Sequence, residues 1–150
     1  MALKTQNGNR DIESTPEDTI RRHLDALASA CTSLEHGMAL LKHRDGHVAS
    51  LHKLQGTFPT SFQGEIYNTP IVIWLLETYP RSAPYVHLNP TKDMAVKQPH
   101  SYVDPSGVVS IPYLQNWVYP SSNLVDLISK FSASFSRHPP LFTRRPKPPP

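Results

Sequence analysis

Cysteine and long apolar runs are both scarce in this chain of 150 residues. Cys31 is the single cysteine, so an intrachain disulfide is excluded, and one thiol is typical of a protein that works in a reducing compartment. The longest apolar run, 71–76, is far shorter than the ~20 residues that a bilayer span needs, and the first thirty residues lack the apolar segment of a secretory signal. We therefore expect no direct membrane insertion.

A strong charge of one sign is also missing. The formal net charge is +3, and the basic residues near the end of the chain are interleaved with prolines. Because the charge is small and dispersed, the sequence does not predict a nucleic-acid partner.

Four histidines gather around the first predicted hairpin, at His36, His43, His47 and His52. His43 and His47 flank its turn and can face each other, but no cysteine accompanies them and their spacing matches no zinc motif. We interpret the four as solvated strand residues, and we expect no metal and no cofactor.

The first predicted element is a helix that begins after Thr15. Thr15 is a good N-cap, Pro16 suits the first helical position, and two acidic residues follow in the first turn. Apolar residues then recur at helical spacing, at Ile20, Leu24, Leu27, Ala28 and Cys31. Cys31 lies on this stripe, so we interpret it as a small core residue and not as a nucleophile.

Strands are expected at 37–44, 47–56, 66–76 and 85–88. Asp45-Gly46 between the first two is typical of a two-residue hairpin turn. The centre of the third strand is β-branched and aromatic, which predicts burial on both faces. Short links between successive strands indicate an antiparallel meander.

Prolines divide the rest of the chain. Five of the sixteen fall within 90–120, so no long helix or central strand is expected there, and long loops of this kind are usually functional. A last helix is expected at about 122–136, with its buried stripe at Leu124, Leu127, Ile128, Phe131 and Phe135. The predicted fold is α+β, with an N-terminal helix, a four-stranded antiparallel meander, a proline-rich loop and a C-terminal helix, the helices lying against one side of the sheet.

The domain organisation follows from these boundaries. Residues 1–14 are expected to form a flexible N-terminal tail, 15–145 a single domain, and 146–150 the start of a proline-rich linker toward further modules.

Three stretches together resemble a known family: 56–91 with its strand core "IVIWLL", 103–117 ("VDPSGVVSIPYLQNW") and 139–144 ("PPLFTR"). They are similar to the ubiquitin-conjugating-enzyme variant (UEV) domain of the ESCRT-I subunit in the tumour-susceptibility / vacuolar-protein-sorting family, and most of all to its plant ELC-type members. The resemblance covers about 15–145 and implies a ubiquitin-conjugating-enzyme-like fold.

The resemblance places Ser110 where a conjugating enzyme carries its thioester-forming cysteine. Thioester transfer needs a thiolate, whereas a serine forms an ordinary ester and needs a base to activate it. The histidines nearest in sequence, His100 and His138, form no recognisable triad pattern with Ser110. We therefore expect no catalytic residue and no enzymatic activity.

The resemblance also implies a groove for Pro-Thr/Ser-Ala-Pro-type peptides. Such grooves combine flat rings for prolines with polar groups for the peptide backbone. The matching positions are Thr57, Phe62, Tyr67, Asn68, Pro70, Met94, Pro140, Leu141, Phe142 and Thr143. Phe62 stands where the family commonly has tyrosine, and Leu141 and Thr143 are larger than in animal members, which predicts a narrower pocket. The alternative is that the aromatic residues are simply core.

A second surface implied by the resemblance binds ubiquitin through the first hairpin turn and the exposed face of the sheet. The matching positions are Arg44, Asp45, Trp74, His87 and Thr91. His87 replaces a phenylalanine of animal relatives, so we predict weak ubiquitin binding that weakens further below about pH 6, where histidine protonates. The alternative for Trp74 is a buried core residue.

The resemblance therefore predicts a non-catalytic adaptor in endosomal, multivesicular-body sorting, cytoplasmic and peripheral on endosomes. Its expected partners are ubiquitin, ubiquitylated cargo, proline-rich peptides and, through coiled-coil regions outside this chain, other ESCRT-I subunits. An inactive partner subunit that directs an active ubiquitin-conjugating enzyme is the alternative.

Overall fold

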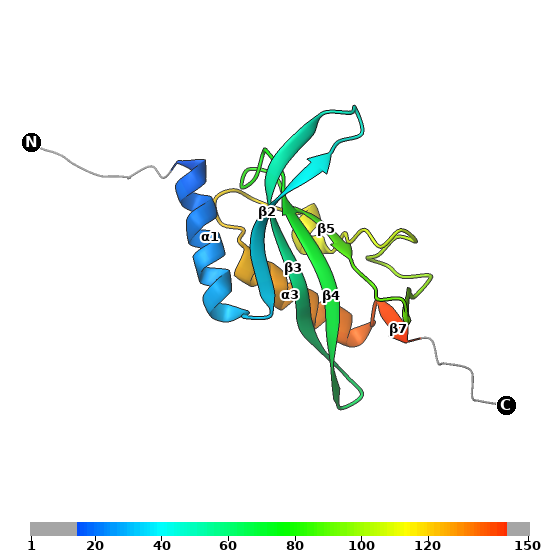
Figure 1. Ribbon diagram of the computed structural model, residues 1–150. Coiled ribbons are helices and arrows are strands. Elements are labelled where there is room, and N and C mark those ends of the chain that lie inside the picture. The colour runs from blue at the N-terminus through cyan, green and yellow to red at the C-terminus, as the bar shows by residue number, and fades with distance from the viewer. Residues whose placement is uncertain (1–14, 144–150) are drawn as a thin grey trace, which may run out of the picture.

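The computed structural model describes residues 15–143, so the predicted tail at 1–14 and linker at 146–150 lie outside the described residues. An antiparallel sheet forms the centre of the molecule, and the helices α1 (Pro16–Ala30) and α3 (Leu124–Arg137) lie on one side of it (Figure 1). This arrangement confirms the predicted α+β fold. Within 15–143 no helix is both long enough and apolar enough to cross a membrane.

Helix α1 begins as predicted, because the Thr15 side chain accepts a hydrogen bond of 3.1 Å from the Asp18 backbone N–H. The predicted stripe is wrong at one position. Leu27 is buried, but Ala28 is exposed and Thr19 is buried in its place. The buried face of the helix is thus centred on Leu27, and Ala28, which is next along the helix, points to solvent.

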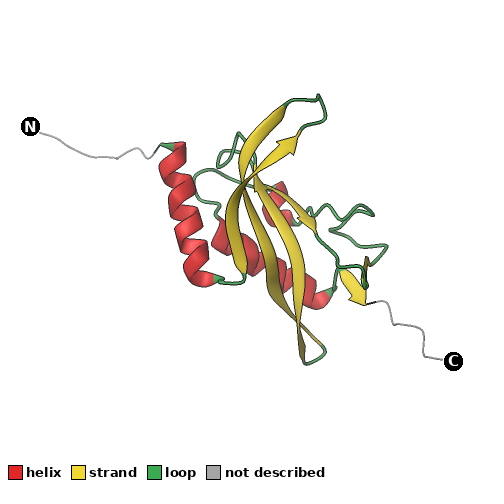
Figure 2. Cartoon of the chain, in the orientation of Figure 1, coloured by secondary structure: helices red, strands yellow, loops and turns green. Residues whose placement is uncertain are grey.

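The main sheet has the strand order β2-β3-β4-β5, and every neighbouring pair is antiparallel. The strands are β2 (Leu34–Lys42), β3 (Val48–Phe62), β4 (Glu65–Leu75) and β5 (Tyr85–Leu88). Figure 2 shows the long hairpins that these strands form. The meander was predicted, and the buried centre of β4 is confirmed.

The turn between β2 and β3 corrects the prediction of a two-residue Asp45-Gly46 turn. His43 N–H donates to His47 O at 2.8 Å, and Gly46 N–H donates to His43 O at 2.9 Å. Three residues, 44–46, therefore form the loop, and Gly46 takes a positive φ of 96°. A type I turn followed by a left-handed glycine is the common geometry for a loop of this length.

Strand β3 continues six residues beyond its predicted end at residue 56. The extension pairs with the start of β4 across a tight turn at Gln63 and Gly64, whose φ angles are 51° and 82°. Positive φ at both central residues is typical of the type I′ hairpin turn, which matches the twist of the strands. This turn was not predicted, because it contains Gln where Asn or Asp is usual.

Helix α3 packs against one face of the sheet. All five residues of its predicted stripe are buried. The Phe58 ring of β3 lies 5.6 Å from the Phe131 ring and 6.0 Å from the Phe135 ring, measured between centroids. We call the side of the sheet that faces α3 the inner face and the opposite side the outer face. Alternation along β3 places Leu54, Phe58 and Thr60 on the inner face.

The segment between β5 and α3 contains short elements only, as its prolines predicted. They are β6 (Met94–Val96) and the helix α2 (Pro112–Gln115). Strand β7 (Leu141–Thr143) follows α3 and pairs antiparallel with β6 in a separate two-stranded sheet. This pairing was not predicted, because the two strands are short and about 45 residues apart in the sequence.

Candidate functional site

The loop before Ser110 is shaped by Asp104. Its Oδ1 accepts hydrogen bonds from the Ser106 hydroxyl at 2.6 Å, the Ser106 N–H at 2.9 Å and the Val108 N–H at 3.0 Å. These bonds, the Ser106 hydroxyl first, hold the pKa of Asp104 below its ordinary value. Leu88 N–H donates to Gly107 O at 2.8 Å, so the loop is joined to the end of β5.

Ser110 itself is exposed, and its side-chain partner in the described structure is Gln115. The Gln115 amide donates to the Ser110 carbonyl at 2.7 Å and to its hydroxyl oxygen at 3.2 Å, and an amide N–H cannot take a proton. Both nitrogens of His100 are engaged elsewhere, since Nδ1 accepts from Tyr102 N–H at 3.0 Å and Nε2 bonds to His138 O at 2.8 Å. In the part of the chain that the structure describes, no histidine hydrogen-bonds to the Ser110 hydroxyl.

The first half of the predicted peptide site lies at the far end of the β3–β4 hairpin. Thr57 pairs with Pro70, and Asn68 occupies an outer-face position two residue pairs further on, opposite Pro59. Tyr67 and Phe62 lie on the inner face, and they extend that face beyond the end of α3. The Tyr67 side chain is 48% exposed and Phe62 is half-buried, so neither ring is sealed in the core.

The second half lies on the two-stranded sheet. Met94 pairs with Thr143, and Lys97 N–H donates to Pro140 O at 2.8 Å. Met94 and Leu141 are half-buried, whereas Pro140 is buried. The side chains of Phe142 and Thr143 lie outside those that the structure describes.

The C-terminal end of α3 connects the two halves. Ser61 N–H donates to the Ser136 hydroxyl at 3.0 Å, and the Ser132 hydroxyl donates to Pro59 O at 2.8 Å. Strand β7 begins four residues after α3 ends. On the other side, Asn89 N–H donates to Pro70 O at 3.1 Å and leads the chain toward β6. The structure thus places both halves around one end of the domain.

One residue of the predicted ubiquitin face, Trp74, is more buried than the prediction required. Trp74 is only 7% exposed and belongs to a small apolar cluster on the outer face with Leu51 and Val72. The Lys53 ammonium lies 5.1 Å from the centre of the Trp74 ring, and Trp74 Nε1–H donates to His87 Nε2 at 3.4 Å. Little of the ring is open to a partner. We expect Trp74 to hold Lys53 and His87 in place, a role for Lys53 that the sequence analysis missed.

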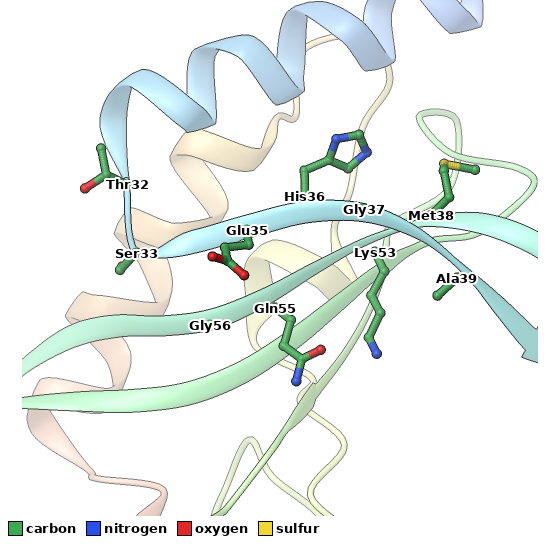
Figure 3. A pocket seen from close by; sticks show the side chains of 10 residues that line it. All are labelled: Thr32, Ser33, Glu35, His36, Gly37, Met38, Ala39, Lys53, Gln55 and Gly56. Carbon is green, nitrogen blue, oxygen red and sulfur yellow. The ribbon is translucent and has the colours of Figure 1, made fainter.

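A broad hollow of about 750 Å³ lies beside this cluster, between β2 and β3 (Figure 3). The Glu35, Lys53 and Gln55 side chains point to one side of the strands there, and His36 points to the other. A second cavity of about 190 Å³ lies next to the two-stranded sheet and is lined by Lys97, Pro99, His100, Ser101, His138 and Pro139. None of the predicted site residues whose side chains the structure describes lines either cavity.

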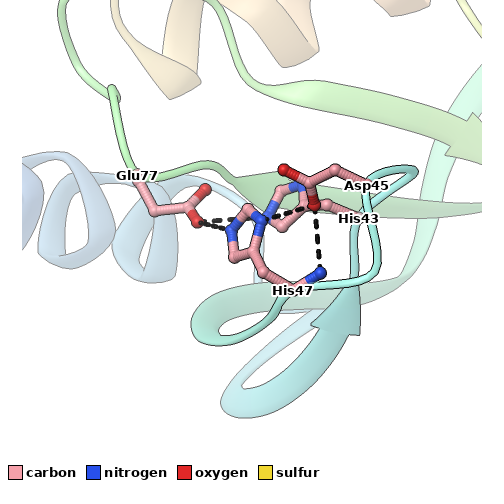
Figure 4. Close-up of polar contacts among 4 residues, drawn as sticks. All are labelled: His43, Asp45, His47 and Glu77. Atoms are coloured by element: carbon pink, nitrogen blue, oxygen red, sulfur yellow. Dashed lines mark hydrogen bonds and ion pairs between the residues drawn. The ribbon is translucent and has the colours of Figure 1, made fainter.

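The turn that carries the predicted contacts Arg44 and Asp45 is held by side chains (Figure 4). Asp45 Oδ1 accepts from His47 N–H at 3.0 Å and bonds to His47 Nδ1 at 2.8 Å. These bonds lower the pKa of Asp45, the backbone bond first. The carboxylates of Glu77 and Asp45 raise the pKa of His47 by hydrogen bonding. Arg44 and Thr91 are exposed.

Comparison with known proteins gives consistent matches. A family model described as "UEV domain" matches residues 11–143. "Protein ELC" of Arabidopsis thaliana is 58% identical over 126 residues, which make up 84% of this chain and 32% of that relative. This chain therefore spans about a third of the length of that curated relative.

Two solved structures share the fold. The yeast Vps23 UEV domain in complex with a Vps27 PSDP peptide has a TM-score of 0.67 at 20% identity, covering 88% of this chain and 84% of that one. The Vps23 UEV in complex with ubiquitin has a TM-score of 0.63 at 22% identity, covering 81% and 83%. At these identities the likeness is one of fold.

Proposed function

The chain belongs to the UEV domain family, and from that premise we propose that it is a non-catalytic adaptor with two ligands, ubiquitin on sorted cargo and short Pro-Thr/Ser-Ala-Pro peptides. The observation that carries the proposal is the family match over 11–143. A UEV domain of the same fold has been solved with a PSDP peptide and with ubiquitin, which supports these two ligand classes.

We propose that Ser110 occupies the position of the catalytic cysteine and does no chemistry. UEV domains are inactive variants of conjugating enzymes, and the Ser110 hydroxyl has only an amide donor, Gln115, as its side-chain partner in the described structure. A ubiquitin-charging assay tests this assignment. No ester or thioester is expected with the natural chain, because a serine needs a base to activate it and the described structure pairs the Ser110 hydroxyl with the Gln115 amide.

The peptide is proposed to bind between the β3–β4 hairpin and the two-stranded sheet. Tyr67 and Phe62 would supply flat faces for prolines, and Met94 and Leu141 would form the apolar wall opposite. Thr57 and Asn68 have the outer-face alternation, so they are proposed to contact a different part of the peptide than the two rings do.

Ubiquitin is proposed to bind the outer face, from the exposed turn at Arg44 and Asp45 to His87 and Thr91. The Lys53 ammonium, held above Trp74, adds a positive charge to the middle of this surface. Binding to two separate surfaces lets one domain hold a cargo signal and a sorting partner at the same time.

We infer that the whole protein works in the cytoplasm, at the surface of endosomes, as an ESCRT-I subunit. The resemblance to the tumour-susceptibility / vacuolar-protein-sorting family supports this placement. Contacts with other ESCRT-I subunits would then involve regions outside this chain.

Chemical-shift mapping of the isotope-labelled chain with two titrants tests the proposal. Ubiquitin is expected to shift resonances at Arg44 and His87, and a Pro-Thr-Ala-Pro peptide those at Tyr67 and Met94. A peptide with both prolines replaced by alanine is the control for nonspecific shifts.

The outcomes separate the two candidate functions. Two distinct sets of shifts support the adaptor. Absence of both, together with a stable complex with an active ubiquitin-conjugating enzyme in size-exclusion chromatography, would instead assign the chain as the inactive partner of such an enzyme.

A further inference from the structure

The two histidines that flank the β2–β3 turn are fixed face to face. Because His43 N–H donates to His47 O at 2.8 Å, the two residues lie directly opposite each other across the hairpin. Their rings are stacked, with centroids 4.1 Å apart and an interplanar angle of 18°. Backbone pairing thus brings two imidazoles to one side of the turn before any ligand is present.

A carboxylate from another part of the sheet meets both rings. Glu77 follows β4, and its Oε2 lies 3.1 Å from His43 Nε2 and 3.1 Å from His47 Nε2 (Figure 4). The three ligand atoms all lie within 4.8 Å of one another. The outer-face cluster explains the approach, because Leu41 of β2 and Leu76, the neighbour of Glu77, pack against its buried residues.

These separations suit a metal ion. Zinc bonds to nitrogen and oxygen of about 2.1 Å, arranged as a tetrahedron, place the ligand atoms roughly 3.4 Å apart. The observed 3.1 Å from each imidazole to Glu77 Oε2 is within a few tenths of that value. Two imidazoles and one carboxylate form a borderline donor set that suits Zn²⁺, Ni²⁺ or Cu²⁺ better than Mg²⁺ or Ca²⁺.

Asp45 prepares one of the rings for coordination. Its carboxylate can only accept, so the 2.8 Å contact with His47 places a proton on Nδ1 and leaves Nε2 as the ring atom directed at Glu77. A carboxylate behind a histidine ligand fixes the ring in this way in many metal sites. A proton on Nε2 lets the ring donate to Glu77, and a metal ion that binds there displaces this proton and takes its place between the ring and the carboxylate.

We propose that His43, His47 and Glu77 form a binding site for a divalent transition-metal ion, with Asp45 as the supporting carboxylate and water completing the coordination. The site is open to solvent, since the side chains of His43, His47 and Glu77 are 23%, 53% and 46% exposed. An ion bound there ties the turn to the segment after β4. This departs from the sequence-based expectation of no metal, which did not include Glu77, a residue 30 positions from His47.

The chain contains its own matched control. His36 and His52 also form a stacked pair on the same hairpin, with centroids 5.0 Å apart and Nε2 of His36 2.8 Å from Nδ1 of His52. In the described structure no carboxylate bonds to either ring of this pair. A site that depends on two histidines alone would therefore bind metal equally well there.

Isothermal titration of zinc sulfate into the tag-free, chelator-treated chain tests the proposal. One saturable site is expected. His47→Gln and Glu77→Gln should each weaken it by more than the roughly ten-fold that loss of an outer-shell partner costs, and Asp45→Asn by about ten-fold. His36→Gln should leave the affinity unchanged.

Cobalt substitution gives a second readout that does not depend on affinity. Tetrahedral Co²⁺ with nitrogen and oxygen ligands produces visible absorption bands, which should be present in the natural chain and in His36→Gln and absent in His47→Gln. Amide spectra confirm that each variant is folded. Absence of saturable zinc binding, or equal loss of binding in His36→Gln and His47→Gln, would overturn the proposal. Neither result bears on ubiquitin or peptide binding.

Discussion

The inner and outer faces of the main sheet are built from alternate residues of the same strands, yet different interactions hold them. On the inner face Phe58 is fully buried between two phenylalanines of α3. On the outer face no helix of residues 15–143 covers the sheet (Figure 1). Three buried side chains there are supplemented by a cation–π contact from Lys53 and a hydrogen bond between Trp74 and His87.

The difference indicates how one sheet can serve stability and recognition together. Burial of apolar area dominates the stability of a domain, whereas exposed polar contacts contribute little. The inner face also continues past the end of its helical cover, where Tyr67 is 48% exposed. We therefore expect stability to depend on the covered part of the inner face, and recognition on the outer face and the uncovered hairpin end.

The largest expected effect comes from Phe58→Ala. The ring is 0% exposed and joins β3 to α3, so its removal should lower the free energy of unfolding by about 3–5 kcal/mol. Urea denaturation followed by circular dichroism measures the change. Leu40→Ala, at a side chain 71% exposed, should change it by less than about 0.5 kcal/mol. Similar losses in both variants would contradict the division of roles between covered and open positions.

Tyr67→Ala tests the uncovered end of the inner face. An exposed aromatic anchor in a peptide site contributes about 2 kcal/mol, so affinity for a Pro-Thr-Ala-Pro peptide should fall roughly 30-fold. Fluorescence anisotropy with a labelled peptide gives the ratio. Leu40 of β2 is 71% exposed and lies outside the proposed groove, so Leu40→Ala is the control. If both variants bind the peptide as the natural chain does, the groove is elsewhere.

His87→Phe should remove part of the pH dependence of ubiquitin binding to the outer face. His87 Nδ1 lies 3.1 Å from Leu88 O and must donate to it, so the neutral ring accepts the Trp74 N–H at Nε2. A second N–H on this ring would oppose the Trp74 donor, and its charge would lie on the same face as the Lys53 ammonium. Ubiquitin affinity of the natural chain should fall by several-fold, at most about ten-fold, between pH 7.5 and 5.5.

The variant is expected to lose less affinity over the same interval, as measured by isothermal titration. Peptide binding to the other surface is the internal control and should be similar at both pH values. A natural chain whose ubiquitin affinity stays constant with pH would remove His87 from the interface.

Several elements were readable from local sequence alone. Thr15, Pro16 and the acidic first turn locate the start of α1, and the apolar spacing of α3 identifies its whole buried face. These features depend on residues within one or two turns of each other. The buried centre of β4 was readable for the same reason, because its apolar run is continuous.

Other features depend on partners that are distant in sequence. The pairing of β6 with β7 and the meeting of His47 with Glu77 both join segments that no local pattern relates. The resemblance supplied the candidate site, but it could not reveal that Trp74 is buried beneath Lys53, since burial depends on how three strands pack. Asp104 and Gln115, which shape the surroundings of Ser110, were missed for the same reason.

The smallest expected effect concerns His23, beneath the inner face. Tyr79 keeps its proton because burial raises its pKa, and its hydroxyl lies 2.6 Å from His23 Nδ1. Burial, followed by the charge of Arg22, lowers the pKa of His23. The unfolded chain then binds more protons than the folded one below the ordinary histidine pKa of about 6.5. The contribution of His23 to the free energy of unfolding should be fully present above that pH. It should decrease as the pH falls toward the pKa of His23 in the folded chain.

His23→Gln should therefore lose less stability than the natural chain between pH 7.5 and 5.5 in urea titrations with a chelator present. His52 has its pKa lowered by burial too, so part of the decrease should remain in the variant. Hydrogen bonds to the carboxylates of Glu77 and Asp45 raise the pKa of His47, which is the opposite direction. The contribution of His47 to the pH dependence of stability is the same in both chains. An identical pH profile for the two would mean that solvent reaches His23 freely in the folded state, and that the inner face is less closed than its apolar residues indicate.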